Sequence, residues 1–134
     1  MIRFTVNIKP MGAVRMTQRS KWKDKAAQNY LAYKSVIGLE ARKAIPEPKL
    51  NPVIICVNCY YPIPNSFKKI DKELARSGHL RPDVKPDIDN VIKGVMDGLN
   101  GIAYKDDKQV VGMMTNKFYA EEPRLEIMIE EWCA

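Results

Sequence analysis

The stretch KPDIDNVIKGVMDGLNGIAYKDDKQV, residues 85–110, governs how the whole chain is interpreted. Five of the chain's eight aspartates fall within it: Asp87, Asp89, Asp97, Asp106 and Asp107. The chain is nevertheless basic, with a formal net charge of +6 at pH 7. Carboxylates are the hard oxygen ligands that Mg²⁺ prefers, and Mg²⁺ completes its shell with water and substrate phosphates. Because surrounding Lys and Arg would bind a phosphate backbone, the stretch predicts metal-assisted cleavage of a nucleic acid.

The first half of this stretch has the spacing of an amphipathic helix. Apolar residues recur at helical intervals over Ile88–Leu99, and Asn100-Gly101 is a typical stop and turn. Asp89, Lys93 and Asp97 are separated by four residues each, so they share one face of the helix. The opposite, apolar face is expected to dock on a sheet.

We expect the acids on either side of this helix to converge. Asp87 lies just before the helix, where the extended chain can turn it toward Asp89. Asp106 and Asp107 are expected to begin the next strand and to bring Asp107 back beside the start of the helix. Carboxylates meeting there would bind one or two Mg²⁺ ions, which activate water and orient the scissile phosphate.

Each of these residues also has an ordinary structural explanation. Asp before a helix is a common N-cap, Asp89 and Lys93 form a common i,i+4 pair, and Asp106-Asp107 could be a solvated turn. A helix start, however, needs only one capping carboxylate, and several mutually repelling carboxylates indicate a bound cation. Asn90 is expected to hydrogen-bond a carboxylate that ligates the metal.

Three short segments together resemble the signature of the RusA-type Holliday junction resolvases, or crossover junction endodeoxyribonucleases: residues 85–93, 97–101 and 106–110. The resemblance implies an Mg²⁺-dependent homodimeric enzyme, often encoded by prophages, that resolves four-way DNA junctions by paired nicks in recombination and repair. Mn²⁺ is expected to substitute for Mg²⁺, and no small-molecule cofactor is expected.

The resemblance also implies roles for single residues. Asp87, Asp89 and Asp107 match the catalytic acids that bind the metal, and Lys93 matches the functional lysine. Asp106 matches the first of the family's paired acids and is expected to support the ligating carboxylates in a lesser role.

Two other functions remain open. The acids could be structural in a DNA-binding protein that does not cut, or the nuclease could act on forks or flaps instead of junctions. The Pro-Asp…(Asp/Glu)-x-Lys nucleases are a poorer match, because those enzymes need an acid-x-Lys on a separate strand and Asp106-Asp107-Lys108 lacks that spacing.

The basic charge is concentrated in the first part of the chain. Residues 1–50 hold eleven Lys and Arg against three acids, whereas the tail from Tyr119 holds five glutamates against one arginine. A basic segment of this kind suits nucleic acid, although an ordinary solvated surface is the alternative. The residues expected to contact DNA are Arg15, Arg19, Lys21, Lys23 and Lys85.

The remaining pattern predicts a single α+β domain over residues 1–134, with a mixed sheet packed against helices. Alternating residues and apolar runs indicate strands, helical spacing indicates helices, and Pro and Gly mark the loop at 77–86. The strands are expected at Arg3–Lys9, Val53–Tyr61, Lys108–Tyr119 and Arg124–Trp132, and further helices at Asp24–Ala44 and, capped by Asn65-Ser66, at Phe67–Ala75. The apolar face of the helix at Asp24–Ala44 is expected to hold Tyr30, Leu31, Val36, Ile37, Leu39 and Ala41.

Other residue types carry weaker signals. Cys56 and Cys59 form a CxxC, but on a strand they point to opposite faces, so they are expected to be packing residues and not a metal or redox site. His79 is expected to be a surface residue, and Met113 and Met114 are expected to be packing residues on a strand. No long apolar run predicts a membrane span, and the start of the chain predicts a strand and not a signal peptide, so we expect a cytoplasmic protein.

Overall fold

A single mixed sheet organises the chain. The computed structural model describes residues 1–17 and 23–133. Its strands lie in the order β1-β4-β2-β3, with β4 antiparallel to both β1 and β2 and β3 parallel to β2. The predicted α+β class with a mixed sheet is therefore confirmed. The bounds of the strands are β1 (Ile2–Val6), β2 (Val53–Pro62), β3 (Val110–Ala120) and β4 (Arg124–Glu131).

One face of the sheet forms the core. Along β2, residues alternate between buried and more exposed, as expected for a strand covered on one side. Val57 pairs with Ile127 of β4, which in turn pairs with Phe4 of β1. Val57 and Ile127 are completely buried, so these neighbouring strands present one continuous apolar surface to the helices.

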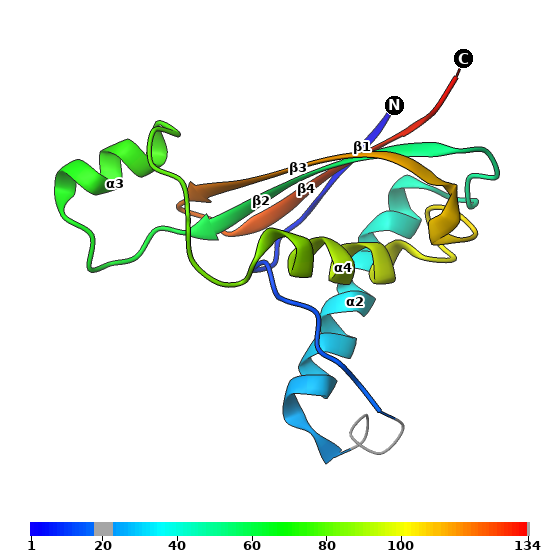
Figure 1. The fold of residues 1–134 in the computed structure, drawn as a ribbon, viewed down its shortest axis with the longest axis horizontal. Coiled ribbons are helices and arrows are strands. Elements are labelled where there is room, and N and C mark those ends of the chain that lie inside the picture. Colours follow the sequence, from blue (N-terminus) through cyan, green and yellow to red (C-terminus); the bar gives the residue numbers. More distant parts are fainter. Residues whose placement is uncertain (18–22, 134) are drawn as a thin grey trace.

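Two helices cover that surface. Figure 1 shows α2 (Lys25–Ala44) and α4 (Ile88–Leu99) on the same side of the sheet, with α3 (Lys69–Arg76) beyond the end of the strands. The helix predicted at residues 88–99 is confirmed at both ends. It approaches α2 closely, since a Cβ on Gly98 would lie 3.2 Å from the Lys34 carbonyl oxygen.

The details of two helices differ from the sequence prediction. The buried face of α2 includes Tyr30, Tyr33 and Ile37, whereas Leu39, expected to be part of it, lies on the solvent side and is 60% exposed. The cap proposed for α3 was also wrong. The helix begins later, after Lys68, whose side chain makes no capping hydrogen bond with any part of the chain that is described.

The segment before β3 also differs from its prediction. Asp107–Gln109 forms a single 3₁₀ turn, and the strand begins only at Val110. Met113 and Met114, expected to be packing residues, are both exposed on this strand at the edge of the sheet.

The two cysteines of the CxxC behave as expected for packing residues. Both are free thiols on β2, with Cys59 buried on the helix side and Cys56 partly buried on the other. Burial raises the pKa of the Cys59 thiol to about 11, which suppresses the reactive thiolate.

Candidate active site

The start of α4 presents two carboxylates to solvent. Asp87 is the N-cap residue in an extended conformation, yet its side chain makes no capping hydrogen bond to the described chain. Asp89 follows in the first turn, and both residues are exposed. Since neither helix capping nor burial explains this pair, the two carboxylates are available to a ligand from outside the chain.

The loop that leads into α4 is held against the sheet. The Tyr61 hydroxyl donates a hydrogen bond to the Pro86 carbonyl, directly before Asp87. Lys117 donates to the Val84 carbonyl at 2.6 Å, and its ammonium lies 4.8 Å from the centre of the Tyr61 ring. Strands β2 and β3 therefore fix the backbone from which Asp87 projects.

This contact makes Tyr61 a positioning residue. Tyr61→Phe is expected to lower the free energy of unfolding by about 1 kcal/mol, the usual net value of one hydrogen bond, and to reduce turnover at saturating DNA. Thermal unfolding and single-turnover cleavage measure the two effects. Tyr60→Phe is the matched control, because Tyr60 lies on the opposite face of β2. Equal turnover in the two variants would contradict the role.

Asp107 lies in a different place, near the end of α4. Its neighbours are Tyr104, whose hydroxyl donates to the Met96 carbonyl at 3.2 Å, and Asp97. One carboxylate oxygen of Asp107, Oδ1, is buried and has no hydrogen-bond partner among the described residues. Burial, together with Asp97 and Asp106, raises the pKa of Asp107, although the Tyr104 hydroxyl opposes this shift.

The expected convergence of the three acids is not found within one chain. Asp87 and Asp97 are ten residues apart along the helix, which corresponds to about 15 Å at 1.5 Å per residue. Asp107 lies near Asp97 at the end of the helix, so it is far from Asp87 and Asp89. In agreement, no group of three or more His, Cys, Asp or Glu in the described chain is placed to hold a metal ion.

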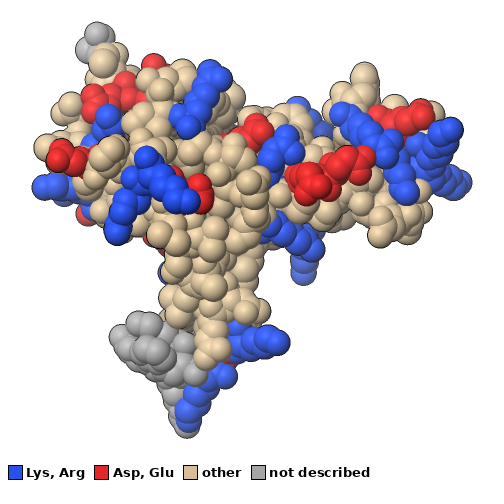
Figure 2. Space-filling model, turned by 180° about the vertical axis from the view of Figure 1, so that it is seen from behind, with Lys and Arg blue, Asp and Glu red and all other residues tan. Residues whose placement is uncertain are grey.

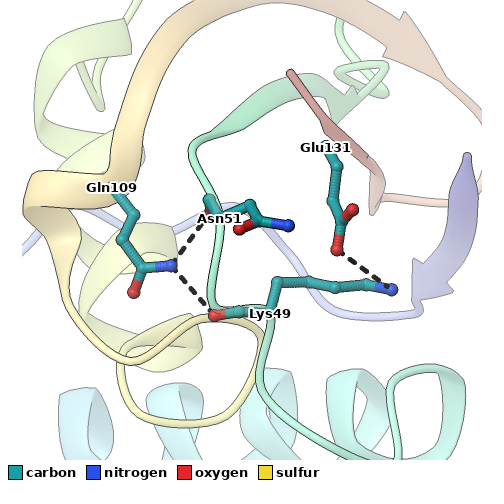
Figure 3. Close-up of polar contacts among 4 residues, drawn as sticks. All are labelled: Lys49, Asn51, Gln109 and Glu131. Atoms are coloured by element: carbon teal, nitrogen blue, oxygen red, sulfur yellow. Dashed lines mark hydrogen bonds and ion pairs between the residues drawn. The ribbon is translucent and has the colours of Figure 1, made fainter. Parts of the chain in front are cut away.

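The other acidic residue of the motif has a clear structural role. Asp106 accepts a hydrogen bond from the Lys108 backbone at 3.3 Å and forms a capping box with Gln109. The Gln109 amide then donates to the carbonyls of Lys49 and Asn51, at 2.9 and 3.0 Å (Figure 3). Gln109, which the sequence analysis did not single out, thus joins the motif to the loop before β2.

The remaining motif residues are accounted for along α4. Lys93 is exposed on the same face as Asp89 and Asp97, as predicted. Asp97 accepts a hydrogen bond from the Tyr30 hydroxyl at 3.0 Å. The Asn90 side chain lies beside Gly12, and the backbone carbonyl of Asn90 accepts a hydrogen bond from the Ala13 backbone at 3.2 Å. Asn90 therefore joins α4 to the N-terminal segment, a contact that the sequence did not reveal.

Basic side chains surround these elements. Arg15, Lys23 and Lys85 are exposed, whereas Arg19 and Lys21 lie outside the described residues. Figure 2 shows Lys and Arg gathered at the tip that carries the start of α2 and around α3. His79, at the end of α3, is exposed and contacts Ser77 through Nδ1 at 2.7 Å.

The raised pKa of Asp107 predicts that its ionised carboxylate lowers the free energy of unfolding. Because the pKa is higher in the folded state, the contribution of Asp107 to stability is present below its unfolded pKa and is lost as the pH rises through its folded pKa. Asp107→Asn, without metal, is therefore expected to raise the free energy of unfolding at pH 8 relative to the wild type. Urea unfolding from pH 4 to 8 tests this, and an unchanged or lower value at pH 8 would contradict it.

The donors present suit Mg²⁺ in their chemistry. Asp87 and Asp89 would hold such an ion at the start of α4, whereas the unpartnered oxygen of Asp107 lies near the other end of the helix. The exposed carboxylates at the helix start thus offer hard oxygen ligands in a basic α+β chain, whose Lys and Arg side chains attract phosphate.

Comparison with known proteins agrees with this class of site. A family model described as Endodeoxyribonuclease RusA matches residues 7–130. The chain belongs to this RusA endodeoxyribonuclease family. It is also 44% identical over 126 residues to a protein of Bacillus subtilis (strain 168) named Uncharacterized protein YqaN, and the match covers 92% of this chain and 87% of that relative.

None of the helices within the described ranges is long and apolar enough to cross a membrane.

Proposed function

We propose that the protein is an Mg²⁺-dependent endodeoxyribonuclease that resolves four-way DNA junctions by paired nicks. The observation that carries the proposal is the exposed pair Asp87 and Asp89 at the start of α4, in a chain of the RusA family. The proposal includes Mn²⁺ as a substitute metal, a single domain over residues 1–134, action in the cytoplasm, and no small-molecule cofactor.

The chain's own residues then have defined tasks. Asp87 and Asp89 hold the metal, which supplies charge stabilisation at the phosphate. Lys93, one turn further along the exposed face, neutralises charge on the phosphate or on the carboxylates. Asp107 is the third catalytic acid of the proposal. Lys85 and the basic segment that includes Arg15 and Lys23 bind the flanking backbone.

A homodimer completes the proposal. Two symmetric nicks require two sites related by a two-fold axis. Within one chain Asp107 lies at the other end of α4 from Asp87 and Asp89, and a second copy could bring acids of different chains together. Light scattering at micromolar concentration should give twice the chain mass of 15.3 kDa, and a monomer that cuts junctions symmetrically would argue against this part.

The choice of substrate separates the proposal from its alternatives. Synthetic four-way junctions, forks and linear duplexes of the same sequence are incubated with Mg²⁺ or with chelator. We expect cleavage only with metal and fastest on the junction. Binding without cleavage under all metal conditions would favour a non-catalytic DNA-binding protein, and preferred cleavage of forks would replace the junction as substrate.

Salt provides a further prediction. Because Lys and Arg release counterions from each phosphate that they neutralise, affinity falls steeply with salt. If six to ten phosphates are contacted, junction affinity should fall by about 10³–10⁵-fold between 50 and 200 mM salt. Fluorescence anisotropy, recorded in chelator at several salt concentrations, measures how junction affinity depends on salt. A flat response would count against a surface that follows the DNA backbone.

A further inference from the structure

A hollow of about 660 Å³ adjoins Asp87. Its walls are two segments far apart in sequence, Lys9–Gly12 and the start of α4 from Lys85 to Asn90. This volume is within the range of about 300–1,000 Å³ that is typical of small-molecule sites. The hollow and the proposed metal site therefore share Asp87 on their common rim.

Specific contacts build the wall of the hollow. The Tyr33 hydroxyl accepts a hydrogen bond from the Met11 backbone at 3.3 Å, and the Ala13 backbone donates to the Asn90 carbonyl at 3.2 Å. Between them, Gly12 is packed so closely that a Cβ there would lie 2.8 Å from the side-chain nitrogen Nδ2 of Asn90. The N-terminal segment is thus fixed against α4, and the hollow is a defined feature of the fold.

The chemistry of the lining indicates one kind of ligand. Met11 and Pro86 are partly exposed and offer apolar surface to a flat ring, while the ammonium groups of Lys9 and Lys85 belong to exposed residues on the same lining. An apolar surface with two cations suits a group that is both flat and anionic. A nucleotide, with its base and its phosphates, has both properties.

We propose that this hollow takes the nucleotide next to the scissile phosphate, unstacked from the DNA at the branch point. Lys9 and Lys85 bind its phosphates, and Met11 and Pro86 contact its base. The inference rests on the proposed function and extends it to substrate selection. Extruding a base costs unstacking and unpairing energy, and the base stack is already interrupted at a branch point, so the hollow would favour branched DNA over continuous duplex.

The test uses the fluorescence of 2-aminopurine, which replaces single bases next to the mapped cleavage sites of a synthetic four-way junction. Fluorescence rises when this base leaves the stack. With wild-type protein in chelator we expect a several-fold rise at one position on binding, and no rise on linear duplex. No rise at any flanking position, by a protein that cuts the same junction with Mg²⁺, would overturn the inference and leave the nuclease intact.

Variants locate the effect in the hollow. Met11→Trp fills it and should abolish the fluorescence rise and reduce junction cleavage at least tenfold, whereas Met114→Trp, on the exposed edge strand, should do neither.

Because Met11→Trp could misfold, Lys9→Ala is the second variant, with Lys43→Ala on α2 as its control. Only Lys9→Ala should weaken the fluorescence rise. An unchanged rise in Met11→Trp or Lys9→Ala would place the base elsewhere and overturn the inference. A wild type that neither binds nor cuts junctions would refute the proposed function itself, and the inference with it.

Discussion

Asp89→Asn is expected to reduce cleavage of four-way junctions by more than about 100-fold, because loss of even an outer partner of a metal ligand costs 10–100-fold. Asparagine keeps the size of the side chain but removes the charge that Mg²⁺ needs. Junction binding should persist or tighten, since the variant loses a negative charge near the DNA. Single-turnover cleavage and anisotropy measure the two properties.

Asp71→Asn is the matched control for this variant. Asp71 is also in the first turn of a helix, α3, but is absent from the motif. Its substitution should leave cleavage within about twofold of the wild type, as for surface changes away from special features. Full activity in Asp89→Asn would refute the metal role of this acid, and equal losses in the two variants would indicate a general effect of charge.

Leu99→Ala is expected to lower the free energy of unfolding by about 3 kcal/mol, within the range measured for buried Leu→Ala changes. Leu99 is completely buried at the end of α4, and its carbonyl accepts hydrogen bonds from the backbones of Ile102 and Ala103. The loss is a large part of the stability of a typical domain. Urea unfolding measures it.

The control for this variant is the same substitution on another helix. Leu39→Ala on α2 removes a side chain that is 60% exposed, so the change in unfolding free energy should stay within about 0.5 kcal/mol. A similar cost at both positions would mean that α2 packs by the face that the sequence suggested and not by the Tyr30–Ile37 face of the structure.

The sequence predicted α4 because its signal is local. The apolar spacing from Ile88 to Leu99 defines the helix, and the same spacing puts Asp89, Lys93 and Asp97 on the exposed face. For α2 the pattern was ambiguous, since Leu39 and Val36 are as apolar as the residues that are buried. Only the packing of Tyr30 and Ile37 against the core distinguishes the two faces.

The position of Asp107 could not be predicted, because it depends on strand pairing between distant segments. β3 pairs parallel to β2, with Val110 opposite Val53. This places the start of β3, and Asp107 before it, near the end of α4. The local sequence does not specify whether the next strand begins beside the start or beside the end of the preceding helix. The role of Gln109, by contrast, had a sequence signal, since an acid followed by Gln three residues later is the pattern of a capping box.

The hollow beside Asp87 was equally beyond sequence reasoning. It depends on the contact of Gly12 with Asn90, and these two residues are separated in the sequence by the basic segment, two helices and one strand. A glycine in a short loop predicts a turn, and its partner emerges only in the folded chain.

The most direct test of the central claim is to map cleavage on all four strands of an immobile synthetic four-way junction, with Mg²⁺ and with chelator. We expect two nicks at symmetric positions on opposite strands, present with Mg²⁺ and absent in chelator. Cleavage that persists in chelator, or no cleavage with Mg²⁺ by a protein that binds the junction, would contradict it.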